Sequence, residues 1–215
     1  MSFSTVTLDL LEAFLQNGLV FILTLLGAIP LGLIITFGSM SKFKPLKYLV
    51  KTFVWIIRGT PLMLQLFVVM YVPGLVFDMP MQSRLTAVMI AFIINYAAYF
   101  SEIYRGGIES IPKGQYEAGQ VLGMTKSQIF FKVVLFQVIK RIVPPMGNEI
   151  ITLVKDTSLA NIIAVSELFR AAKNEASRTA SVEPLFVAGL FYLLMNGVVT
   201  LVFSYLTRRY EYYKD

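Results

Sequence analysis

Long stretches without any charge are the feature that most limits what this chain can fold into. Leu19–Phe37 contains no Asp, Glu, Lys or Arg, and neither does Gly59–Phe77. An α-helix needs about 20 predominantly apolar residues to cross the hydrocarbon core of a bilayer. Charged residues make up only 15% of the sequence, whereas soluble domains carry about 25%. The sequence therefore predicts an all-α, polytopic membrane protein.

The apolar stretches predict five transmembrane helices in a single membrane domain that comprises residues 1–215. The expected spans are residues 17–40, 52–77, 84–105, 128–154 and 184–208. The fourth span is the least regular, because Lys132, Lys140, Arg141 and Glu149 interrupt it. We expect neighbouring helices to screen this span from lipid and the span to line something polar. After it, Val165–Ala176 is expected to form an amphipathic helix over the outer mouth of the bundle.

The positions of the basic residues predict an orientation. Eleven of the 19 Lys and Arg residues lie in the loop between the first two spans, the segment between spans three and four, and the C-terminal tail. Lys and Arg concentrate on the cytoplasmic side of membrane proteins. The N-terminus is therefore predicted outside and the C-terminus in the cytoplasm. The net charge of +6 is explained by this asymmetry, so nucleic acid is not an expected partner.

The composition excludes several kinds of chemistry. The chain contains neither Cys nor His, which removes disulfides, thiolate or imidazole metal sites, and catalytic triads with histidine. It also lacks a Gly-rich phosphate-binding loop of the P-loop type. We therefore expect no metal site, no ATP hydrolysis by the chain itself and no enzymatic activity.

Residues 112–125, between spans three and four, are predicted to form a short cytoplasmic helix followed by a sharp turn. Pro112 suits a helix start, and Gly123 suits a helix end because glycine accepts positive φ. Thr125 with Gln128 matches a capping box that opens the next helix. Small Ala118 and Gly119 would let another protein approach the backbone, and Glu117 offers a charge to a basic partner. An ordinary loop with good turn chemistry is the alternative reading.

The fourth span carries the first set of candidate substrate-binding residues. Pro144 and Pro145 lack amide donors, so the helix is expected to kink or break near residues 140–144, and broken helices at membrane depth line cavities. Glu149, Thr152 and Asp156 follow at spacings that place them on one helical face. Two carboxylates there would attract an ammonium group. Alternatively, Glu149 or Asp156 forms a structural ion pair; the candidate partners are Arg58, Lys140 and Lys155.

The second and third spans contribute further candidates. Tyr96 and Tyr99 belong to a polar stripe on span three that suits either substrate contact or interhelical hydrogen bonding. In span two, Thr60 is a candidate substrate contact and Pro61 frees backbone carbonyls. Arg58 suits a substrate carboxylate, a position snorkelling toward the cytoplasm, or an ion pair at an inner gate.

Several motifs resemble those of permease subunits from ATP-binding-cassette (ABC) importers, in particular type I importers for polar amino acids. The resemblance covers roughly residues 15–210. It rests on Glu117-Ala-Gly119 with Gly123, which resembles the family's EAA loop, on Arg58-Gly-Thr-Pro-Leu62, on Lys155-Asp-Thr-Ser-Leu159, and on Gly147-Asn-Glu149. Two positions depart from the family pattern: Gly119 replaces the usual second Ala, and Phe136 stands where Pro is common.

The resemblance implies partners and a mechanism. A coupling helix, with Glu117, Ala118, Gly119 and Gly123 at the docking surface, would sit in a groove of a cytoplasmic ATPase. The complex would hold two ATPase copies, which bind ATP and Mg²⁺, and a second permease subunit, identical or homologous. A binding protein outside a bacterial cytoplasmic membrane would deliver a polar amino acid. A self-sufficient ion-coupled carrier or channel without an ATPase is the alternative.

Overall fold

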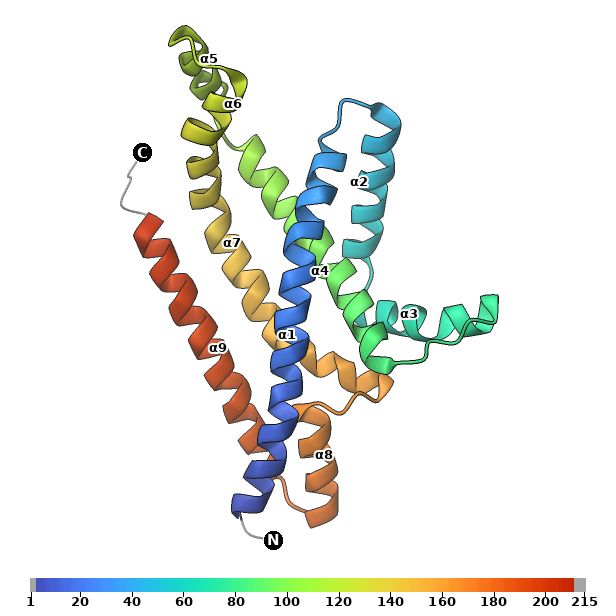
Figure 1. Ribbon diagram of the computed structural model, residues 1–215. Coiled ribbons are helices and arrows are strands. Elements are labelled where there is room, and N and C mark those ends of the chain that lie inside the picture. The colour runs from blue at the N-terminus through green and yellow to red at the C-terminus, as the bar shows by residue number, and fades with distance from the viewer. Residues whose placement is uncertain (1–2, 211–215) are drawn as a thin grey trace.

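The computed structural model describes residues 3–210, and every regular element in that range is helical (Figure 1). In chain order the elements are α1 (Phe3–Ser39), α2 (Lys44–Gly59), α3 (Leu62–Phe77), α4 (Arg84–Glu109), α5 (Lys113–Val121), α6 (Lys126–Ile129), the π-helix η1 (Phe130–Val134), α7 (Leu135–Asp156), the 3₁₀ segment η2 (Thr157–Ile163), α8 (Leu168–Thr179) and α9 (Glu183–Tyr210). The all-α class is as predicted.

Three helices of the described range are long and apolar enough to cross a membrane. They are Leu10–Ser39 within α1, the whole of α4, and α9. The pair α2 and α3 adds a fourth span if the two are taken together. The helix α7 belongs to the predicted fourth span, although its charged residues set it apart from these apolar helices. The total of five transmembrane helices stays a prediction.

The second span departs from the continuous helix expected over residues 52–77. The axes of α2 and α3 differ by 107°, and in Figure 1 α3 projects sideways from the lower end of α2. Pro61 precedes the first turn of α3, and Thr60 before it has the extended conformation, with φ −119° and ψ 143°. A residue that precedes proline is disfavoured in the α region. The corner therefore follows from the local sequence.

Helix α4 lies at the centre of the core, between α1 and α7. Buried side chains of α1, α3, α4, α7 and η2 form one cluster around Phe92, Tyr96 and Phe100. The Thr36 hydroxyl of α1 lies 3.0 Å from the Ser101 carbonyl of α4. On the other side, a Cβ atom added at Gly107 would lie 2.3 Å from Cγ2 of Ile142 on α7. The helices α4 and α7 thus approach as closely as a glycine allows.

Helix α7 runs without a break from Leu135 to Asp156, although Pro144 and Pro145 lie inside it. Of the predicted kink or break near residues 140–144, the break is therefore wrong, and a kink stays a prediction. A proline removes one amide donor and leaves one carbonyl without its helical partner, and in α7 the chain keeps its helical path on both sides of the pair. The irregular turns lie earlier, where Phe130–Val134 forms a π-helix between α6 and α7.

The end of the bundle opposite α5 and α6 is closed by a polar network around Asn17 of α1. The Asn17 side-chain amide lies 2.9 Å from both the Thr157 hydroxyl and the Tyr192 hydroxyl, and its carbonyl accepts from the Leu168 amide at 2.8 Å. Glu167 accepts hydrogen bonds from Tyr192 and from two amides at the start of α8. This cap explains why the amphipathic helix begins at Leu168 instead of at the predicted Val165.

Candidate functional site

The structure brings two of the predicted site residues into direct contact across the interface of α4 and α7. The Tyr96 hydroxyl donates a hydrogen bond of 2.8 Å to Oδ2 of Asp156. Tyr96 is 2% exposed and is packed between Phe92 and Phe100 on its own helix. Because its ring is held on both sides, the hydroxyl is a fixed donor to the carboxylate at the C-terminal end of α7.

Glu149 lies two turns before Asp156 on α7, and the predicted common face is preserved because α7 is regular between them. No ion pair joins Glu149 or Asp156 to a Lys or Arg within residues 3–210. The expected pairing with Arg58, Lys140 or Lys155 is thus not found in that range. The charges that act on Glu149 are those of Arg58 and Asp156. Thr152, between the two acids, donates its hydroxyl to the Asn148 carbonyl at 3.1 Å.

Arg58, in the last turn of α2, contacts α4 instead. Its guanidinium lies 3.6 Å from Oε2 of Glu102 and 5.1 Å from the centre of the Tyr99 ring. Arg105 also pairs with Glu102, at 2.6 Å. Glu102 is therefore shared by two cations on two helices. A cavity of about 240 Å³ adjoins this cluster, and its lining includes Lys51 and Trp55. Of the roles predicted for Arg58, the ion pair is the one present here.

Thr60 and Pro61 form the corner between α2 and α3, and a nearby glutamine connects that corner to α4. The Thr60 hydroxyl donates to the Ile56 carbonyl at 2.9 Å, and Gln65 donates to the Thr60 hydroxyl at 2.9 Å. Gln65 in turn accepts from the Asn95 amide at 3.0 Å. Sequence reasoning missed Gln65. Its signal was available, since it is the single amide in an otherwise apolar stretch.

Residues 112–125 fold as a short helix followed by a sharp turn, as predicted. Helix α5 follows Pro112, and Gly123 has a φ of 71°, in the left-handed region. The Thr125 hydroxyl and the Gln128 side chain complete the expected capping box. The segment therefore has the helix, turn and helix that the sequence indicated.

The side chains of this segment divide between an exposed and an internal face. Glu117 and Ala118 are exposed. Gly119 is buried, and a Cβ atom there would lie 2.6 Å from Cγ1 of Ile129. The expectation that Gly119 opens the backbone to another protein is thus wrong, because its small size serves the packing of α5 on α6. Val121 and Leu122, which sequence reasoning missed, are 88% and 78% exposed.

Comparisons with known proteins agree on one family. Residues 28–212 match the family described as "Binding-protein-dependent transport system inner membrane component". The L-cystine transport system permease protein TcyB of Bacillus subtilis is 40% identical over 195 residues, which are 89% of this chain and 82% of that protein. The glutamine transport system permease protein GlnP of Escherichia coli K12 is 33% identical, over 88% of this chain and 85% of that protein.

Solved structures share the fold. A chain from the crystal structure of an amino acid ABC transporter with histidines has a TM-score of 0.87 and 31% identity, over 97% of this chain and 99% of that chain. An inward-facing form of the MetNI methionine ABC transporter, at 16% identity and TM-score 0.69, shares the fold alone. By the extent of these matches, the chain belongs to the family of binding-protein-dependent transport system inner membrane components.

Proposed function

We propose that this protein is the membrane-spanning permease subunit of an ATP-driven importer of polar amino acids. Its family and its extensive similarity to permeases for cystine, arginine and glutamine support that role. The complex holds two copies of a cytoplasmic ATPase, which bind ATP and Mg²⁺, and a second permease subunit, identical or homologous. A binding protein on the other side of the membrane supplies the amino acid.

The observation that carries the substrate site is the face of α7 that presents Glu149 and Asp156. Neither carboxylate has a cationic partner within residues 3–210. A carboxylate at membrane depth is costly unless a positive or hydrogen-bonding group compensates it. The α-ammonium group of an amino acid, or a basic side chain, supplies that compensation. Glu149 and Asp156 therefore bind the positive end of the substrate, and Tyr96 orients Asp156.

Three other predicted residues act around that site. Tyr99 lies under Arg58, so it forms the wall between the carboxylates and the Arg58–Glu102 pair. Thr152 and Thr60 already donate their hydroxyls to backbone carbonyls, so each contacts substrate as a hydrogen-bond acceptor. Arg58 acts at the gate, because its partner Glu102 lies on another helix. Pro61, together with Pro144 and Pro145, shapes the backbone around these side chains.

Helix α5 transmits the movement of the ATPase. Glu117 and Ala118 lie exposed on it, and the exposed Val121 and Leu122 follow at its C-terminal end. Apolar side chains with so much exposure at the tip of a membrane protein suit a protein partner. Contacts of this tip that differ between ATPase states shift the transmembrane helices between inward-open and outward-open conformations. Gly123 allows the turn that joins α5 to α6 and, through η1, to α7.

The orientation follows from the same assignment. In Figure 1 the α5–α6 tip and the C-terminal end of α9 lie toward one end of the bundle, and the N-terminus lies at the other. Helix α5 must face the cytoplasm to meet an ATPase. The C-terminus is then cytoplasmic and the N-terminus is outside, in a bacterial inner membrane, in agreement with the distribution of Lys and Arg.

Reconstitution tests the proposal. The chain is placed in liposomes with its ATPase, its second permease and its binding protein, and uptake of the amino acids that the binding protein retains is measured. Glu149→Gln and Asp156→Asn should each lower uptake at least about tenfold, the effect of losing roughly 1.4 kcal/mol of binding. The control Lys173→Gln changes an exposed charged side chain on α8, outside the proposed site, and should leave uptake unchanged. Full uptake in both acid variants would refute the substrate site, and uptake without ATPase or ATP would refute the importer.

A further inference from the structure

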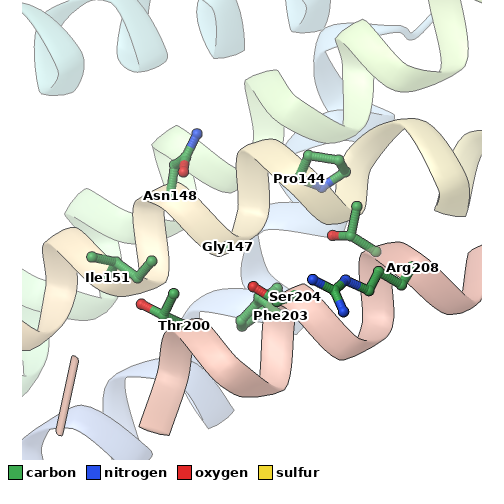
Figure 2. Close-up of a pocket in the computed structure, with 9 residues that line it drawn as sticks. Pro144, Gly147, Asn148, Ile151, Thr200, Phe203, Ser204 and Arg208 are labelled. Atoms are coloured by element: carbon green, nitrogen blue, oxygen red, sulfur yellow. The ribbon is translucent and has the colours of Figure 1, made fainter. Parts of the chain in front are cut away.

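Helices α7 and α9 enclose a groove that none of the proposed transport steps uses. Its volume is about 380 Å³. Figure 2 shows the two helices side by side, and the groove is lined by Pro144, Asn148 and Ile151 of α7 and by Thr200, Ser204 and Arg208 of α9. The groove also contains Thr207, and its floor is Phe203, which packs against Gly147. At about 100° per residue, these α7 positions lie on a different face of the helix from Glu149 and Asp156.

The polar side chains of this groove have no partner within the described part of the chain. Thr36, Thr60 and Thr152 each donate their hydroxyl to the carbonyl four residues earlier. The hydroxyls of Thr200, Ser204 and Thr207 donate no such hydrogen bond within residues 3–210. The side-chain amide of Asn148 also makes no hydrogen bond in that range. Three of these groups lie on α9, one of the helices that can span the membrane. Polar groups that face lipid tails without a partner are costly.

The groove has a charge at one end only. Arg208 is its one charged lining residue among those described, and no ion pair of Arg208 is found within residues 3–210. Arg208 lies two residues before Tyr210, the last described residue of α9, and basic residues near the end of a membrane-spanning helix reach toward the headgroups. With a rise of 1.5 Å per residue, Ser204 lies about 6 Å and Thr200 about 12 Å deeper along the axis.

The order of these groups along the groove, with a guanidinium at one end and hydroxyls deeper along α9, matches the chemistry of one phospholipid. A phosphate lies at the membrane surface, the ester carbonyls lie deeper, and the acyl chains follow. A guanidinium binds a phosphate through parallel hydrogen bonds, and hydroxyl and amide donors suit the ester carbonyls. The charge of the groove is positive, so an anionic headgroup complements it. Ile151 and Phe203 supply apolar surface for the chains.

We propose that the groove between α7 and α9 is a binding site for one anionic phospholipid. Arg208 and Thr207 hold the phosphate, and Ser204 and Asn148 donate to the ester carbonyls. Bound lipid connects α9 to α7 and thereby stabilises the helix that carries Glu149 and Asp156. The site requires only that α9 crosses a membrane, so it stands even if the substrate proposed above is wrong.

Native mass spectrometry of the delipidated complex, with phosphatidylglycerol or phosphatidylcholine added in detergent, tests the site. The wild-type complex should bind phosphatidylglycerol more tightly than phosphatidylcholine. Arg208→Gln should weaken phosphatidylglycerol binding about fivefold, because one basic residue near an anionic lipid contributes about 1 kcal/mol. Arg209→Gln is the matched control, since it removes the same charge one residue outside the groove, and it should leave binding unchanged. The paired substitution Ser204→Ala and Thr207→Val should also weaken binding while keeping the charge.

Three results would overturn the proposal. Equal losses in Arg208→Gln and Arg209→Gln would mean that bulk charge attracts the lipid. Inorganic phosphate that displaces phosphatidylglycerol at equal concentration would mean that the groove is a site for free anions. A disulfide between two copies carrying Ser204→Cys, formed in the intact complex within a bilayer, would mean that the second permease occupies the groove. The substituted side chains at 204 and 208 are exposed, so these variants are expected to fold.

Discussion

The Tyr96 hydroxyl lies 2.8 Å from Oδ2 of Asp156, so a side chain in the middle of α4 meets the last residue of α7. Tyr96 is fixed in the core, whereas α7 is joined at its N-terminal end, through η1, to α6 and α5. Movement of α7 against α4 therefore changes this one hydrogen bond. Under the proposed function, this contact connects the carboxylate that binds substrate to the helix that receives the movement of α5.

The first prediction concerns that bond. Tyr96→Phe keeps the ring and removes the donor, so uptake by the reconstituted complex should fall about tenfold, since a hydrogen bond to a charged group contributes about 1.5–3 kcal/mol. Asp156→Asn should have a larger effect. The double variant should transport no worse than Asp156→Asn alone, because the tyrosine acts through the carboxylate. Independent, multiplicative losses would show that the two residues serve separate steps.

A second prediction concerns Gly123 at the end of the coupling segment. Its φ of 71° costs a residue with a Cβ about 1–2 kcal/mol, and asparagine less than a β-branched residue. Gly123→Val should therefore uncouple the complex: ATPase activity should no longer rise when binding protein and amino acid are added. Gly123→Asn should retain most of the stimulation. Normal stimulation in Gly123→Val, with a complex of unchanged composition, would contradict the role of this turn.

Two adjacent glycines in α4 allow a matched test of packing. A Cβ atom at Gly107 would lie 2.3 Å from Cγ2 of Ile142, whereas one at Gly106 would meet nothing within 4 Å. Gly107→Ala should destabilise the protein by about 1–3 kcal/mol, the usual cost of overpacking. Gly106→Ala should be neutral or should stabilise it by about 0.5–1 kcal/mol, because alanine favours helices. Thermal unfolding of both purified variants in one detergent measures the difference. Equal unfolding midpoints for Gly107→Ala and Gly106→Ala would mean that α4 and α7 can move apart to accept the added methyl group without loss of stability.

The fourth prediction concerns pH and Glu167, which is 1% exposed. Burial raises the pKa of the Glu167 carboxyl above its ordinary value, although hydrogen bonds from Phe169, Arg170, Tyr192 and Asn17 oppose the rise. A raised pKa means that the folded protein binds this proton more tightly than the unfolded chain does. The stability that Glu167 contributes is then present below the ordinary glutamate pKa of about 4.3, and it is lost as the pH rises through the folded value.

Glu167→Gln removes the titration and keeps the size of the side chain. The stability of the wild-type protein relative to Glu167→Gln should therefore decrease between about pH 4 and neutral pH, above the ordinary glutamate pKa. Unfolding midpoints of both proteins across that range give the comparison. Glu175, which is half-buried on α8, has a lowered pKa because Arg178 donates hydrogen bonds to it. Its contribution to stability is lost only as the pH falls below the ordinary glutamate value, so the control Glu175→Gln should show no such decrease relative to wild type between about pH 4 and neutral pH. A constant difference between wild type and Glu167→Gln would contradict the assignment.

Local signals in the sequence predicted the coupling segment well. The residues around Pro112, Gly123 and Thr125 specify helix starts and ends through their own backbone preferences, and the structure follows them. Gly119 was misjudged for the opposite reason. Its neighbour is Ile129, ten residues later, and no local rule states which side chain will lie against a glycine once two helices fold back on each other.

The second span was predicted as one continuous helix because hydropathy gives no information on the direction of the helix axis. The apolar residues of α3 continue those of α2 in the sequence, so a window of 20 residues joins them, while Pro61 turns the chain by 107°. At the two prolines in α7, by contrast, the sequence predicted a break that is absent, since tertiary packing keeps that helix continuous. Likewise, the sequence placed Asp156 on a polar face, but its contact with Tyr96 depends on how α4 and α7 pack.

The π-helix at Phe130–Val134 has a consequence for the geometry of the whole arm. A π-turn accommodates one more residue than an α-turn, so it shifts the angular phase of everything beyond it by about 100°. Reverting this segment to regular α geometry would rotate the α5 tip around the α7 axis by that amount while leaving Glu149 and Asp156 where they are. The π-turn thus sets the direction in which α5 points relative to the face of α7 that carries Glu149 and Asp156. A change between π and α geometry at this turn would alter that direction without unfolding α5 or α7.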